Sequence, residues 1–225
     1  MHSANPTATG VSRASFLQAR LASFLAVAPL GVWTFLHLWN NLAAFYGAAA
    51  WETSVTGYSS PFAQAFTGCV VLAPLAIHTV WGIGRLFTSK PNNQRYGAYA
   101  NLKYLLQRVA GVGVLFFIGA HLWLALIHPR LTTGHGETFA DIAHEMRFNP
   151  PTLVVYVLGT LGVTYHLANG LQTVAMGWGV VTSKVALKRL EWLSIGFFLL
   201  LLAMAWSVVF ALWSAGAAAP VALLG

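Results

Sequence analysis

The sequence predicts an all-α integral membrane protein with five transmembrane helices. Of its 225 residues, 57% are hydrophobic and only 8% are charged, a balance outside the range of soluble globular domains. Apolar runs of about 20 residues, the length of helix that crosses a hydrocarbon core of roughly 30 Å, occur five times. The expected spans are residues 20–45, 62–87, 106–128, 152–177 and 190–215, within one membrane domain covering residues 1–225.

The uneven distribution of charge predicts the orientation. Ten of the twelve Lys and Arg residues lie in the amino-terminal segment or in the second and fourth connections, whereas four of the five acidic residues lie in the first and third. By the positive-inside rule the amino terminus is cytoplasmic and the carboxyl terminus is outside. Residues 1–18 lack the apolar region of a signal peptide, so the first span is expected to be retained. This placement of the net charge of +7 favours a membrane surface and argues against nucleic acid as a partner.

Each of the first four spans carries one histidine inside its apolar run: His37, His78, His121 and His166. A lone intramembrane histidine most often hydrogen-bonds a neighbouring helix or lines a polar cavity. Four in consecutive spans favour a shared role, because each unpaired imidazole would add its own desolvation cost. A six-coordinate haem iron takes two axial imidazoles, so four make two sites. Because Cys69 is the only cysteine, no CxxCH attachment motif exists, and coordination and packing alone would hold the haems.

The depths of the histidines predict how they pair. His37 and His121 lie about eight and seven residues from the expected outer ends of their spans, roughly 10 to 12 Å at about 1.5 Å per residue. His78 and His166 lie about 16 and 14 residues in, roughly 21 to 24 Å. The first four helices are therefore expected to form a bundle around two stacked haems, with an outer site (His37, His121) and an inner site (His78, His166).

Residues near the histidines are candidates for holding the macrocycles. Gly82 and Gly170 each follow a histidine by four residues, where a missing side chain leaves room for a ring. Gly170 and Asn169 also belong to a stripe of small and polar residues in the fourth span, a pattern that equally serves close helix packing. Basic residues at the inner ends of the spans can pair with haem propionates or reach lipid phosphates: Arg20, Lys103, Arg108 and Lys188.

The third connection contains a helical pattern of its own. Phe139, Ile142, Ala143 and Met146 recur at the spacing of one helix face. This spacing predicts a short amphipathic helix lying on the outer surface.

Four strings combine these residues in order along the first four spans. They are Arg20-Leu21 with Ser23 and His37-Leu38; Pro74-Leu75 with His78 and Gly82; Leu106-Gln107-Arg108-Val109-Ala110-Gly111 with His121-Leu122-Trp123; and His166-Leu167-Ala168-Asn169-Gly170 with Trp178-Gly179. As a set they resemble the dihaem cytochrome b membrane subunit of the type B succinate dehydrogenases and fumarate reductases, a five-helix family.

The resemblance implies two haem b groups with the four histidines as axial ligands in the pairs given above, and it marks Arg20 and Ser23 as further cofactor-binding candidates. It also implies an FAD-containing flavoprotein subunit and an iron–sulfur subunit on the cytoplasmic side of a bacterial cytoplasmic membrane, with a quinone, usually menaquinone, as substrate. The chain would carry electrons between the iron–sulfur subunit and the quinone, linking the tricarboxylic acid cycle to the respiratory chain. Some fumarate reductases carry a glutamate two residues before the fourth ligand, whereas here Thr164 departs from that pattern.

Two other interpretations fit parts of the pattern. Another dihaem cytochrome b anchor, of a nitrate reductase, formate dehydrogenase or hydrogenase, would also use intramembrane histidine pairs. A proton-coupled transporter could use the four histidines as a relay, but it would not require them to lie in two layers.

Overall fold

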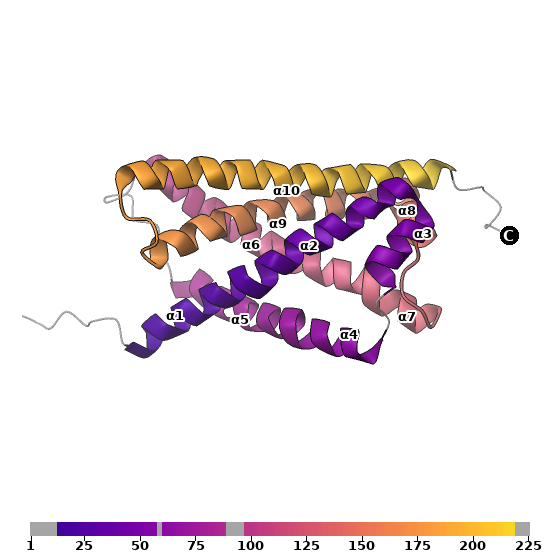
Figure 1. Ribbon diagram of the computed structural model, residues 1–225, viewed down its shortest axis with the longest axis horizontal. Coiled ribbons are helices and arrows are strands. Elements are labelled where there is room, and N and C mark those ends of the chain that lie inside the picture. Colours follow the sequence, from indigo (N-terminus) through magenta and orange to yellow (C-terminus); the bar gives the residue numbers. More distant parts are fainter. Residues whose placement is uncertain (1–12, 58–59, 89–96, 219–225) are drawn as a thin grey trace, which may run out of the picture.

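The computed structural model describes residues 13–57, 60–88 and 97–218, and it confirms the five-helix architecture (Figure 1). Five helical stretches are long and apolar enough to cross a membrane: Phe16–Tyr46, Pro61–Thr88, Ala98–Thr132, Pro150–Gly177 and Lys184–Ala217. The third and fifth begin well before the expected residues 106 and 190. Most of the basic second connection and the amino-terminal segment to residue 12 lie outside the described residues.

Prolines coincide with widened turns in the first three spans. The first comprises α1 (Arg13–Leu25), the π-helical turn η1 (Ala26–Gly31), α2 (Val32–Asn41) and the 3₁₀ turn η2 (Leu42–Tyr46). The second comprises α4 (Pro61–Thr67), η4 (Gly68–Leu72) and α5 (Ala73–Thr88); the third comprises α6 (Ala98–Leu122), η5 (Trp123–Ile127) and α7 (His128–Thr132). Pro29 lies inside η1, while Pro74 and Pro129 follow η4 and η5. Since proline lacks an N–H group and clashes with the carbonyl four residues earlier, a widened turn accommodates it within a continuing helix.

The fourth and fifth spans form the best-packed part of the bundle. They are α9 (Pro150–Gly177) and α10 (Lys184–Ala218), which run antiparallel and side by side in Figure 1. The most extensive contacts join α9 to α10 and to α6, whereas α5 makes few contacts with α6. Leu201 and Ala205 of α10 are almost completely buried. The span containing α4 and α5 therefore lies on the loosely packed side of the bundle.

The predicted amphipathic helix is present as α8 (Phe139–Phe148), and all four residues of its apolar face are buried. The face packs mainly against α10, with further contacts to α3 (Ala48–Trp51), so it meets protein rather than lipid. Thr138 and Asp141 form a capping box at its amino end. Glu52 is the first residue of the π-helical turn η3 (Glu52–Thr56), and its carboxylate accepts a hydrogen bond from the Phe139 N–H at 3.0 Å. Thus α8 closes one end of the bundle as a packed cap.

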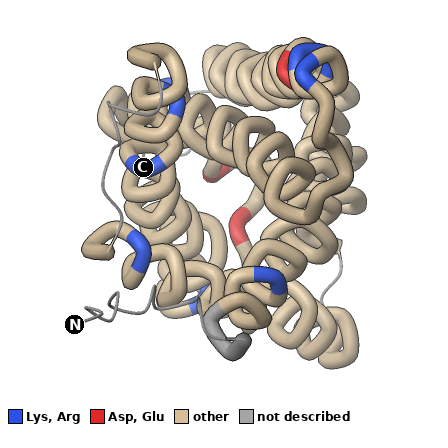
Figure 2. Tube along the Cα trace, turned by 90° about the vertical axis from the view of Figure 1, so that its left-hand side faces the viewer, with Lys and Arg blue, Asp and Glu red and all other residues tan. Residues whose placement is uncertain are grey.

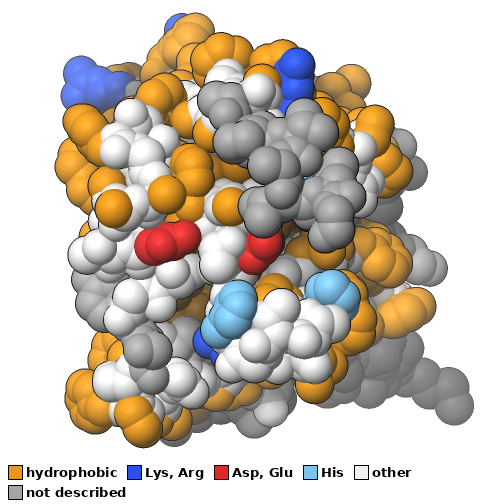
Figure 3. Space-filling view, turned by 90° about the vertical axis from the view of Figure 1, so that its right-hand side faces the viewer, with side chains coloured by type: hydrophobic (Ala, Val, Ile, Leu, Met, Phe, Trp, Pro, Cys, Tyr) orange, Lys and Arg blue, Asp and Glu red, His pale blue; other side chains and the backbone are white. Residues whose placement is uncertain are grey.

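The two ends of the bundle differ in charge, and we name them after the predicted orientation. Lys and Arg residues lie on several helices around the inner end, which faces the viewer in Figure 2. At the outer end acidic side chains and histidines lie near the middle of the face, with hydrophobic side chains around them (Figure 3). Large apolar side chains such as Phe62 and Phe87 are more than three-quarters exposed, as expected for a lipid-facing surface.

Candidate functional site

The outer pair of histidines meets between the first and third spans. The imidazole rings of His37 on α2 and His121 on α6 have their centroids 5.9 Å apart and their planes at 69°. The Tyr156 hydroxyl on α9 lies 3.1 Å from Nδ1 of His121. On the other side, the Asn41 side-chain amide approaches Nε2 of His37 at 3.4 Å and accepts a hydrogen bond from Trp51 Nε1 at 3.1 Å.

The inner pair meets between the second and fourth spans. The rings of His78 on α5 and His166 on α9 have their centroids 6.2 Å apart, again with planes at 69°. His166 donates from Nδ1 to the Gln107 carbonyl oxygen at 3.1 Å, and the Gln107 side-chain amide donates back to the His166 carbonyl at 3.1 Å. Asn169 donates to the Gln107 side-chain oxygen at 2.8 Å. This exchange ties α6 to α9 and leaves Nε2 of His166 available as a metal ligand.

Both pairs have the spacing of two axial ligands on one iron. With metal–nitrogen bonds of about 2 Å, and about 1 Å from each nitrogen to its ring centre, two imidazoles on opposite sides of an iron stand about 6 Å apart. The observed separations of 5.9 and 6.2 Å agree with that value. The structure brings the histidines together in the pairs that their depths predict; haem ligation by these pairs stays a prediction.

Comparison with known proteins gives the family. Residues 88–210 match the family described as succinate dehydrogenase/fumarate reductase transmembrane subunit. The chain is also 32% identical over 169 residues to the succinate dehydrogenase cytochrome b558 subunit of Bacillus subtilis (strain 168), covering 75% of this chain and 82% of that protein. The chain belongs to the succinate dehydrogenase/fumarate reductase transmembrane subunits.

A shorter match supports the same family. The succinate dehydrogenase hydrophobic membrane anchor subunit of Thermoplasma acidophilum is 33% identical over 73 residues, covering 32% of this chain and 56% of that protein. The predicted resemblance and the multi-pass membrane location are confirmed. The family match decides against the anchors of other respiratory enzymes and against a histidine-lined transporter.

The glycines of this membrane subunit lie in different surroundings, and a role for Gly82 and Gly170 beside a haem stays a prediction. An added Cβ at Gly82 meets nothing within 4 Å, and one at Gly170 lies 3.5 Å from the Gln107 side chain rather than near an imidazole. The close approach is at Gly111 on α6, where an added Cβ would lie 3.0 Å from Cε1 of His166. Gly111 therefore provides the space for the His166 ring, a role that the sequence pattern did not reveal.

The polar candidates at the inner end have specific neighbours. The Arg20 guanidinium lies over the rings of Phe16 and Trp178, at 4.8 and 5.5 Å from their centroids, and Ser23 accepts a hydrogen bond from Trp178 Nε1 at 2.9 Å. The Arg108 guanidinium stacks 3.4 Å from the centre of the Tyr104 ring.

Four buried side-chain polar atoms have no hydrogen-bond partner among the described residues: Nδ1 of His78, Nε of Arg108 and the hydroxyls of Tyr104 and Tyr165. Buried polar groups are seldom left unpaired in a native fold. Two of these atoms lie on α5 and α9, which carry the inner pair, and two lie on α6; they fit a polar or anionic group that the chain alone does not supply.

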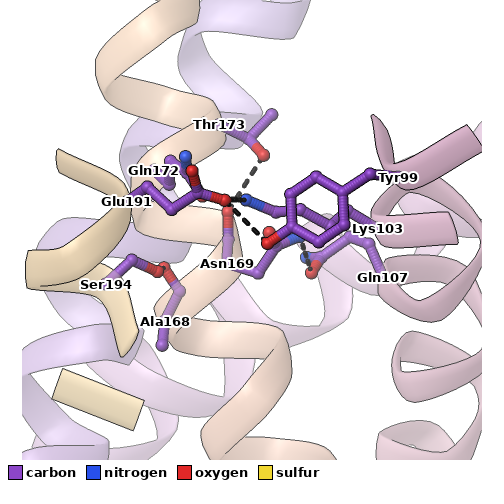
Figure 4. Close-up of polar contacts among 9 residues, drawn as sticks. All are labelled: Tyr99, Lys103, Gln107, Ala168, Asn169, Gln172, Thr173, Glu191 and Ser194. Carbon is purple, nitrogen blue, oxygen red and sulfur yellow. Dashed lines mark hydrogen bonds and ion pairs between the residues drawn. The ribbon is translucent and has the colours of Figure 1, made fainter. Parts of the chain in front are cut away.

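Lys103 is held by other residues (Figure 4). Its ammonium group donates to Gln172 at 2.7 Å and pairs with Glu191 at 3.1 Å, and Tyr99 donates to the same carboxylate at 2.8 Å. Lys103 is thus already paired within the chain, and its pairing with a haem propionate or a lipid phosphate stays a prediction. Thr164, at the position of the glutamate found in some fumarate reductases, is buried and donates to the Thr160 carbonyl at 2.9 Å.

Proposed function

We propose that this chain is the dihaem cytochrome b anchor of a succinate dehydrogenase complex. His37 and His121 would ligate an outer haem b, and His78 and His166 an inner one. When bound, the two haems supply one-electron transfer between an iron–sulfur subunit at the inner end and a quinone, by resemblance menaquinone, near the outer end. The observation that carries the proposal is the presence of two histidine pairs at the separation of axial ligands, stacked along one bundle.

The chain's own residues contribute orientation and exclusion of water. The Gln107 carbonyl fixes the tautomer and direction of His166, and the Tyr156 hydroxyl, which can donate or accept, holds the direction of the His121 ring. All four rings lie half-buried among apolar helices, where water is excluded and only b-type, non-covalent attachment is open to them. The flavin and dicarboxylate chemistry would reside on partner subunits, because the chain has one cysteine and no dinucleotide fingerprint.

The stacking along the bundle has an energetic consequence. An electron that moves from the inner to the outer site crosses part of the bilayer, where the membrane potential contributes up to about 2.3 kcal/mol per charge per 100 mV. Electron flow toward the outer end is therefore coupled to a potential that is negative inside.

Haem content after purification of the intact complex tests the assignment. We expect two b haems per chain by pyridine haemochrome assay, with the sharp reduced bands of low-spin, bis-imidazole iron. His78→Ala and His166→Ala should each lose the same single haem, whereas His37→Ala and His121→Ala should each lose the other. His128→Ala, which changes an exposed histidine, is the matched control and should keep both. Two haems retained in any of the four ligand variants would refute the pairing.

A further inference from the structure

A closed set of three hydrogen bonds joins α6 to α9 at the inner histidine pair. His166 donates from Nδ1 to the Gln107 carbonyl oxygen at 3.1 Å, and the Gln107 side-chain amide donates back to the His166 carbonyl oxygen at 3.1 Å. The other end of that side chain, Oε1 of Gln107, accepts from the Asn169 amide at 2.8 Å (Figure 4). Each of the three side chains is therefore bonded to the facing helix.

Asn169 decides which way the Gln107 side chain faces. It is only 8% exposed and follows His166 by three residues, so both side chains lie on the same face of α9, toward Gln107. A buried amide is seldom left without a partner, and Gln107 supplies one. Because Asn169 binds the oxygen of the Gln107 side chain, the NH₂ group of that side chain faces the His166 carbonyl.

The His166 ring depends on the placement of α6 against α9. One turn after Gln107, Gly111 lies so close to the ring that an added Cβ would be 3.0 Å from Cε1. The ring thus packs against α6 on one side and bonds to the α6 backbone through Nδ1. Any shift of α6 relative to α9 changes the length and angle of that bond, and the Asn169–Gln107 bond opposes such a shift at the same level of the bundle.

We propose that Asn169 is a positioning residue that acts through Gln107 to lower the reduction potential of the inner haem. A ligating imidazole becomes more basic when its other N–H donates to a carbonyl oxygen. A more basic ligand stabilises the oxidised iron, and hydrogen bonding around the ligands is one of the means by which a protein sets a haem potential. Asn169 keeps that hydrogen bond of His166 short. This inference rests on the proposed ligation by His166.

Potentiometric titration of the intact complex, followed at the haem absorption bands, tests it. Asn169→Leu nearly keeps the side-chain volume and removes the donor. We expect it to keep two haems and to raise the reduced-to-oxidised ratio of the inner haem at a fixed potential by about 2- to 10-fold. A tenfold change is a rise of about 59 mV in the midpoint potential. The inner haem is the one that His166→Ala removes, and the outer haem should keep its potential.

Two further variants complete the design. Ser194→Ala is the matched control: the Ser194 hydroxyl donates from α10 to the Ala168 carbonyl at 2.8 Å, so the change removes an interhelical hydrogen bond one residue from Asn169 and should leave both potentials unchanged. Asn169→Leu combined with Gln107→Leu removes both partners and leaves no buried amide unpaired, which favours assembly. It should raise the potential of the inner haem as the single variant does.

The outcomes separate this inference from the proposed function. Two haems with unchanged potentials in Asn169→Leu would overturn the inference and leave the haem assignment standing. Equal shifts of both haems, or the same shift in Ser194→Ala, would show a general loosening of the bundle and overturn it too. If Asn169→Leu does not assemble, the double variant decides by the same criteria, and failure of both would show a role in folding alone, which overturns the inference. A wild-type complex without haem, or two haems retained in His166→Ala, would overturn the proposed function itself.

Discussion

Gly111 offers a test of the inner haem site that leaves every proposed ligand in place. An alanine Cβ at this position would lie 3.0 Å from Cε1 and 3.3 Å from Nδ1 of His166. Non-bonded carbon atoms normally stay about 3.5 to 4.0 Å apart, so the ring must move by roughly 0.5 Å or more. The hydrogen bond from Nδ1 to the Gln107 carbonyl resists that movement.

The expected cost follows from this overpacking. Adding a methyl group to a tightly packed site typically costs about 1 to 3 kcal/mol. If that cost falls on the haem-bound state, the affinity for the inner haem drops by about 5- to 150-fold. The outer pair lies one layer away and does not contact Gly111, so its haem should be unaffected.

Gly113→Ala is the matched control for Gly111→Ala. Gly113 is on the same helix two residues later, and an added Cβ there meets nothing within 4 Å. Both changes improve helix propensity by up to about 1 kcal/mol, so a difference between them reports the contact with His166. We would measure haem per chain, the reduced-minus-oxidised spectrum and the two midpoint potentials.

The expected result is selective loss of, or a spectral shift in, one haem in Gly111→Ala and a wild-type profile in Gly113→Ala. Equal behaviour of the two variants would show that no ligand ring lies against Gly111. A change confined to the haem that the His37 and His121 variants remove would show that the layers are assigned the wrong way round.

Three further predictions concern the outer end. The pKa of Glu137 is raised from 4.5 to about 8, so between these pH values the folded state holds a proton that the unfolded state has lost. The free energy of unfolding should therefore fall by a few kcal/mol as the pH rises from 4.5 to about 8. Thermal-shift measurements should show this decline in the wild type and not in Glu137→Gln. Gly216→Ala should lower Tm by several degrees, since its Cβ would collide with α8, whereas Gly196→Ala, which meets nothing within 4 Å, should not. Glu52→Gln weakens the charge-assisted bond to the Phe139 N–H and should cost about 1 kcal/mol, measured by denaturant or thermal unfolding; an unchanged Tm would contradict that role.

The five spans could be predicted because hydropathy alone defines them, but two of their inner ends could not. The expected starts at residues 106 and 190 are where the apolar runs begin. The third span begins earlier because polar residues on its extension find partners: Tyr99 and Lys103 both bind Glu191, which lies at the expected start of the fifth span. That pairing joins residues far apart in sequence, and no local pattern reveals it.

The histidine pairs could also be predicted, because helix rise converts sequence position into depth. The residues that orient them could not. Tyr156 reaches His121 from 35 residues away, and Gln107 reaches His166 from 59 residues away. Such contacts depend on how neighbouring helices are rotated and shifted, which the spacing within one span does not determine. For the same reason no local pattern singles out Gly111, which lies against the His166 ring from the neighbouring helix.

The two members of the inner histidine pair differ in how firmly the described residues hold them. His121 and His166 stand on the closely packed helices α6 and α9 with hydrogen bonds that fix their rings, whereas Nδ1 of His78, on the loosely attached α5, has no partner among the described residues. The side of the bundle formed by α6 and α9 therefore holds its histidines in fixed directions, whereas α5 holds His78 less firmly. If the pair holds a haem as proposed, His166 stands ready in a fixed direction before the group binds, whereas His78 can adjust its position as the group binds.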